Sequence, residues 1–101
     1  MIAWHEAFAL TVAVELPCVA LTAGDGRRRR AAGDSVLVNL LTHPLAWLAV
    51  GSGTLSFAVT EVLVTATEAA VYRGITGLSS WRAILTSCVA NGATIALSFV
   101  V

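Results

Sequence analysis

Two carboxylates lie seven residues apart in an otherwise apolar stretch of the sequence. Glu61 and Glu68 are embedded among Val, Leu and Ala between residues 55 and 73, and at helical spacing they share one face. A third carboxylate, Glu15, lies in an apolar stretch near the N-terminus. Charged groups are costly in such surroundings and face a bundle interior or a wet cavity. The chemistry open to them is the binding or relay of a proton or a cation.

Three more polar side chains occupy comparable places in the other apolar stretches: Asn39, His43 and Asn91. At about 1.5 Å per residue from each expected helix midpoint, four members of the set lie within about 5 Å of a common midplane, and Asn39 and Glu68 lie roughly 6 to 8 Å from it. The sequence therefore predicts one buried polar or ion-binding cluster, formed by Glu15, Asn39, His43, Glu61, Glu68 and Asn91.

Three interpretations of this cluster remain open. The first is a proton relay or cation site, the second is a metal site, and the third is a set of hydrogen bonds that hold the helices together. Carboxylates in helix-bundle cores bind metals, and the metal candidates here are Glu15, His43, Glu61 and Glu68. The sequence names no cofactor. It has no nucleophile elbow, phosphate-binding glycine loop, CxxC or HExxH motif, so we expect no enzymatic activity.

The composition places the chain among membrane proteins. Of its 101 residues, 57% are hydrophobic and 12% are charged, and the mean hydropathy is +0.84. A soluble domain carries about 25% charged residues, so the deficit and the long apolar stretches indicate a polytopic membrane protein. From this composition we expect the lipid bilayer as a partner. Because the net charge is zero, we expect no nucleic acid as a partner.

The elements that position the cluster are four helices. We expect an all-α membrane protein in which four transmembrane helices form a small bundle with a polar seam, at about residues 2–23, 35–50, 55–73 and 80–101. Residues 24–34 are expected to form a basic loop, after which Asp34 or Ser35 caps the second helix.

The arginines predict the orientation of these helices. All six lie in the first and third connections or at their flanks: Arg27, Arg28, Arg29, Arg30, Arg73 and Arg82. By the positive-inside rule, both connections face the cytoplasm, where the arginines contact lipid headgroups. We therefore expect a protein of the bacterial inner membrane with both termini outside.

The spacing of several of these residues resembles that of a group of small four-helix bacterial membrane proteins. The resemblance covers nearly the whole chain and implies a small polytopic membrane protein without naming a reaction. It is carried by Glu15-x-Pro17, Asn39-x-x-Thr42-His43-Pro44, Glu61-x(6)-Glu68-x(3)-Tyr72 and Ser87-x-x-Ala90-Asn91.

A second resemblance, in architecture alone, is to the small multidrug resistance transporters. These have four spans and an essential membrane-embedded Glu in the first helix, which implies such a role for Glu15. The chain departs from that family in its third helix, where the family usually has no carboxylate, and in lacking most of the cavity aromatics.

Together these features favour proton- or cation-coupled transport, or ion binding, in the membrane. The alternatives are a non-catalytic accessory subunit of a larger membrane complex and an intramembrane metal-binding bundle. A single bundle of this size has a thin interior, so we expect a homo-oligomer or a subunit of a membrane complex.

Overall fold

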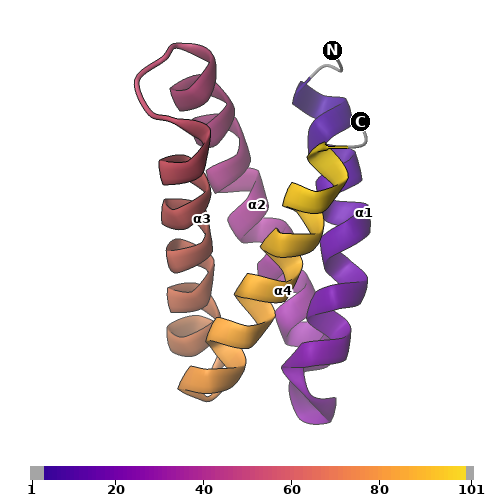
Figure 1. The fold of residues 1–101 in the computed structure, drawn as a ribbon. Coiled ribbons are helices and arrows are strands. Elements are labelled where there is room, and N and C mark those ends of the chain that lie inside the picture. Colours follow the sequence, from indigo (N-terminus) through magenta and orange to yellow (C-terminus); the bar gives the residue numbers. More distant parts are fainter. Residues whose placement is uncertain (1–3, 100–101) are drawn as a thin grey trace.

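Four α-helices that run in alternating directions make up the part of the chain that the structure describes, residues 4–99 of a computed structural model (Figure 1). The helices are α1 (Trp4–Ala23), α2 (Arg28–Gly51), α3 (Phe57–Val71) and α4 (Ser80–Ser98). Each helix packs against two neighbours, in the ring order α1, α2, α3, α4. The expected all-α four-helix bundle is confirmed.

The bundle is elongated along its helices, with extents of 39 × 22 × 19 Å. The start of α1, the end of α4 and the turn between α2 and α3 lie at one end (Figure 1). The α1–α2 and α3–α4 connections lie at the other end. Residues 2, 3, 100 and 101, expected in the first and last helices, lie outside the described residues.

The expected loop over residues 24–34 is wrong for most of its length. α2 begins at Arg28, because arginine is a good helix former and Arg30 pairs with Asp34 one turn later, at 3.5 Å. The chain breaks at Gly24, whose φ of 95° suits glycine. α2 is therefore 24 residues long, and Asp34 lies inside it instead of capping it.

The third helix ends differently from the expected range of 55–73. α3 continues into a π-helical turn, η2 (Tyr72–Thr76), which stops at Gly77. Gly77 has φ 85° and ψ 24°, the left-handed conformation that commonly ends helices. α4 then begins as the sequence predicts: the Ser79 hydroxyl accepts a hydrogen bond from the backbone N–H of Arg82 at 3.4 Å.

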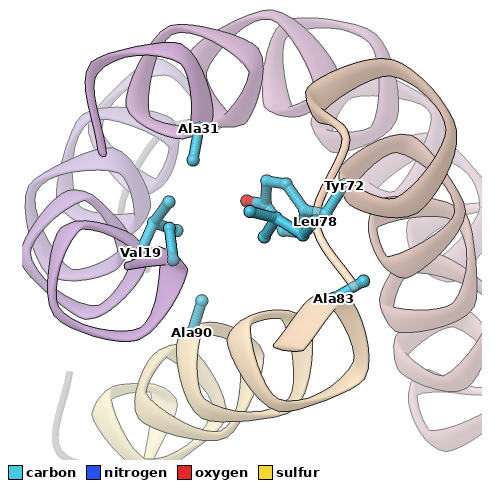
Figure 2. Packing of buried hydrophobic residues seen from close by; sticks show 7 residues of the cluster. Val19, Ala31, Tyr72, Leu78, Ala83 and Ala90 are labelled. Atoms are coloured by element: carbon cyan, nitrogen blue, oxygen red, sulfur yellow. The ribbon is translucent and has the colours of Figure 1, made fainter. Parts of the chain in front are cut away.

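A small apolar cluster fills the half of the bundle nearest these two connections. Figure 2 shows its side chains pointing inward from the surrounding helices, with the Tyr72 ring near the centre. Most members are alanines, which let helices approach closely. The cluster consists of Val19, Ala23, Ala31, Tyr72, Leu78, Ala83 and Ala90.

The other buried side chains are largely polar, and the outer surface is apolar. Glu68 is 0% exposed and Glu15 is 1% exposed, whereas Leu21 is 76% exposed and Val62 is 67% exposed. In the described part of the chain, one helix is long and apolar enough to cross a membrane, at His5–Ala23. One such helix does not establish a membrane protein, because a core helix of a soluble protein meets the same criteria.

Candidate functional site

The carboxylate of Glu15 is bound by side chains from two other helices. Asn39 on α2 donates from Nδ2 to Oε1 at 3.2 Å, and Thr94 on α4 donates from Oγ1 to Oε2 at 2.7 Å. Asn39 also donates from Nδ2 to the backbone carbonyl of Ser35, one turn earlier, at 2.8 Å. Both amide hydrogens are therefore used, which fixes the amide against the carboxylate. Both Glu15 oxygens have a donor.

Glu68 is held by a similar amide but less completely. Asn91 on α4 donates from Nδ2 to Oε2 of Glu68 at 2.9 Å and to the carbonyl of Ser87 at 2.9 Å. The Ser87 hydroxyl in turn donates to the carbonyl of Thr65 on α3 at 2.6 Å, which ties α4 to α3 beside the carboxylate. The second oxygen of Glu68, Oε1, is buried and has no hydrogen-bond partner among the described residues.

A cavity of about 70 Å³ lies between the four helices next to Glu15. Every helix contributes polar atoms to its wall: Glu15 from α1, Asn39 and Thr42 from α2, Glu61 from α3, and Thr94 from α4. A polar cavity of this size is large enough for water or a small cation. Glu15 and Glu61 therefore adjoin a space in which a ligand can sit, whereas Glu68 does not line this cavity.

Two predicted members of the cluster lie at the edge of this arrangement. Glu61 is half-buried and lines both the cavity and a larger apolar groove on the outside of α3 and α4. His43 lines the cavity, and its ring lies between two aromatic rings, 5.5 Å from Phe8 and 6.3 Å from Trp47 between centroids.

The four metal candidates do not form a metal centre in this structure. Among residues 4–99, no three His, Cys, Asp or Glu side chains converge as metal ligands would. A transition metal or Zn²⁺ site needs three or four such ligands at about 2.0 to 2.3 Å. The donors that surround Glu15 are instead amides and hydroxyls.

The arginines of the two connections bind the opposite hairpin through its backbone. Arg30 donates from Nη2 to the carbonyl of Ile75 at 3.1 Å, and Arg82 donates from Nη1 to the carbonyl of Thr22 at 3.0 Å. These carbonyls belong to helix ends, whose last four C=O groups lack partners inside the helix. The arginines thus close the basic end of the bundle.

Of the six residues predicted to form one cluster, the structure brings Glu15 together with Asn39 and Glu68 together with Asn91. The sequence interpretation missed Thr94 and Thr42, which complete the polar wall of the cavity. Both follow their Asn by three residues and so share its helix face. That spacing was the available signal.

No known protein family matches the chain, and neither a curated protein nor a solved structure is similar to it. The chemistry of the buried cluster therefore has to carry the functional argument.

Proposed function

We propose that this protein spans a membrane four times and binds a proton or a cation at its buried carboxylates, as the binding step of proton- or cation-coupled transport. The observation that carries the proposal is the reversed placement of polar and apolar side chains. A protein dissolved in water buries its apolar residues and almost never fully buries Glu without a partner.

The free-energy cost of the apolar surface favours lipid as its surroundings. Leucines on the outside of α2, among them Leu37, Leu41 and Leu48, are more than 60% exposed. Surface valines and leucines also line α3. Soluble monomers rarely expose contiguous apolar patches larger than a few hundred Å², and lipid tails would cover such a surface without cost.

The length of the bundle and the positions of its arginines also support a bundle that spans a bilayer. The 39 Å length of the bundle matches the hydrocarbon core of a bilayer, about 30 Å, plus part of the headgroup regions. All six arginines belong to the end formed by the α1–α2 and α3–α4 connections, and the sequence has no lysine. With that end in the cytoplasm, both termini lie outside.

The ligand follows from the burial of Glu15 and Glu68, whose hydrogen-bond donors are neutral amide and hydroxyl groups. A buried carboxylate without a cationic partner is costly, and it loses its charge by binding a proton or balances it by binding a cation. The ion pair between Arg30 and Asp34 lies at the basic end and does not serve Glu15 or Glu68. Amide and hydroxyl groups, as in this cavity, supply oxygen ligands to a cation or hydrogen bonds to a protonated acid.

Flux measurements in liposomes test this proposal. Purified protein should carry protons or Na⁺ down an imposed gradient, and Glu15→Gln and Glu68→Gln should each lose most of the flux while the protein stays folded. Glu6→Gln is the matched control, because Glu6 is an exposed carboxylate at the end of the same helix as Glu15. Flux at the wild-type level in both variants would refute the proposal.

The second candidate function is an accessory subunit of a larger membrane complex. It is favoured by the outer groove of about 570 Å³ along α3 and α4, which is lined mostly by small and apolar side chains such as Ala58, Ala66 and Ile84. A groove of this kind fits a helix of a partner. Native mass spectrometry after gentle extraction separates the candidates, since a transporter emerges alone or as a homo-oligomer and an accessory subunit emerges with other chains.

A further inference from the structure

The two halves of the chain repeat the same order of residues. The Glu-to-Asn separation is 24 residues in the first half and 23 in the second, and the pattern Ser-x-x-x-Asn-x-x-Thr has the same spacing in both. The repeated positions are Glu15, Gly24, Arg30, Ser35, Asn39 and Thr42 in the first half, and Glu68, Gly77, Arg82, Ser87, Asn91 and Thr94 in the second.

The helices follow this repeat. α1 has 20 residues, and α3 and η2, with 15 and five residues, form a continuous helical segment that matches it. Each segment stops at a glycine of positive φ, 95° at Gly24 and 85° at Gly77. α1 and α3 run in the same direction (Figure 1), as they would if a rotation about an axis along the bundle related the two hairpins.

The contacts between the hairpins are reciprocal, as such a rotation requires. Arg30 of the first hairpin binds the carbonyl of Ile75, and Arg82 of the second binds the carbonyl of Thr22. Arg30 corresponds to Arg82 in the repeat, and Thr22 precedes Gly24 by the same two residues by which Ile75 precedes Gly77. Each hairpin therefore closes the helix end of the other.

Some contacts do not follow the rotation, among them the hydrogen bond from Thr76 to Asp34 at 2.6 Å. The difference that concerns the carboxylates involves Thr94 and Thr42. Thr94 of the second hairpin donates to Glu15 of the first at 2.7 Å, so the rotation predicts that Thr42 donates to Glu68. Thr42 instead donates to the carbonyl of Val38 in its own helix, at 2.9 Å, and Oε1 of Glu68 stays without a partner in the described part of the chain. α1 and α4 also pack together more extensively than their counterparts α3 and α2.

We infer that the bundle contains two equivalent half-sites for one proton or cation, Glu15–Asn39–Thr94 and Glu68–Asn91–Thr42, which close alternately. Here a half-site is called closed when both carboxylate oxygens accept a hydrogen bond: the first is closed in this structure, and in the second Oε1 of Glu68 has no partner among the described residues. Membrane proteins built from parallel repeats commonly bind their ligands where the repeats meet. The nature of the ligand rests on the proposed function, whereas the equivalence of the half-sites rests on the sequence repeat and the reciprocal contacts between the hairpins.

Chemical labelling of the two carboxyl groups tests this inference without a flux assay. Dicyclohexylcarbodiimide enters lipid and modifies protonated carboxyl groups, and peptide mass spectrometry reports each site separately. In wild-type protein in lipid nanodiscs, Glu68 should react about fivefold faster than Glu15, the factor that corresponds to one hydrogen bond. Thr94→Val should accelerate Glu15 by a similar factor and slow Glu68, because Thr42 then closes the second half-site.

Two further variants make the result decisive. Adding Thr42→Val to Thr94→Val should restore fast labelling of Glu68, whereas Thr67→Val, which removes an exposed hydroxyl bonded only to the carbonyl of Leu63, should change neither rate. Glu68 labelling that is the same in wild type and Thr94→Val would overturn the alternation. Absence of flux with the expected labelling pattern would refute transport and leave the half-sites standing.

Discussion

Replacing Asn91 with Ala should destabilise the bundle more than the same replacement of Asn39, although the two side chains occupy equivalent places. Each asparagine donates one amide hydrogen to a carboxylate and one to a backbone carbonyl a turn earlier. The two substitutions therefore remove the same two main hydrogen bonds and leave cavities of similar size; Asn91→Ala also removes a long contact, 3.4 Å, from Nδ2 to the Ser87 hydroxyl. They differ in the number of hydrogen-bond donors that remain for the carboxylate.

The expected difference follows from the donors that are left. In the membrane setting that we propose, a hydrogen bond between helices contributes about 0.6 kcal/mol on average and at most about 1.7 kcal/mol, so Asn39→Ala should cost about 1 kcal/mol while Thr94 still donates to Glu15. After Asn91→Ala, Glu68 has no donor among the described residues. Leaving a buried polar group without a hydrogen-bond partner costs about 1–3 kcal/mol more. Asn91→Ala should therefore lower the free energy of unfolding by about 2–4 kcal/mol.

The free energy of unfolding is measurable in mixed micelles by titrating a mild detergent with dodecyl sulfate. Trp47 and Trp81 are exposed on the bundle surface and report unfolding by fluorescence. Asn39→Ala is the matched control. Equal destabilisation by the two substitutions, or a larger effect at Asn39, would refute the assignment of Thr94 as the second donor to Glu15.

Two further predictions concern the connections at the basic end. Gly77→Ala should destabilise the protein by about 1–2 kcal/mol, because alanine is strained at φ 85°. The control is Gly92→Ala, which lies in a helix with open space around the new Cβ and should be neutral or stabilising by up to about 1 kcal/mol. The same micelle titration measures both. Arg30→Met and Arg82→Met should each cost about 1 kcal/mol, because each removes a hydrogen bond to a carbonyl of the other hairpin; Arg30→Met also removes the pair with Asp34, and no loss of stability in either variant would contradict the reciprocal closure.

That carboxylates and asparagines face the same bundle interior could be predicted from the sequence, because it depends only on helical periodicity. Which of them pair could not: the depth estimate grouped Asn39 with Glu68, whereas Asn39 binds Glu15 and Asn91 binds Glu68. Glu15 and Asn39 each lie on the single polar face of an apolar helix, and four such faces must point inward if the surroundings are apolar. The direction of a face does not specify which donor reaches which oxygen. The contact of Thr94 with Glu15 depends on how closely α4 approaches α1, which periodicity leaves open.

The start of α2 was mispredicted because the run from Arg27 to Arg30 and the Gly33-Asp34 pair look like a loop. Local helix propensity and the Arg30–Asp34 pair extend the helix through that run. The π-helical turn η2 has no signal in residue types. The internal repeat, in contrast, is visible in the sequence, but few of its positions are identical and only the structure shows that they are equivalent.

Thiol labelling in native membranes tests most directly whether lipid covers the apolar surface. Single cysteines are introduced at three positions in a background in which both native cysteines are replaced. Ser52→Cys probes the α2–α3 turn, Gly26→Cys probes the basic connection, and Val62→Cys probes the outer face of α3, where Val62 is 67% exposed. A membrane-impermeant maleimide applied to intact spheroplasts should label Ser52→Cys at once, Gly26→Cys only after permeabilisation, and Val62→Cys in neither case. Labelling of Val62→Cys as fast as that of Ser52→Cys would mean that water covers this face, and the account of a membrane-embedded carboxylate site would be wrong.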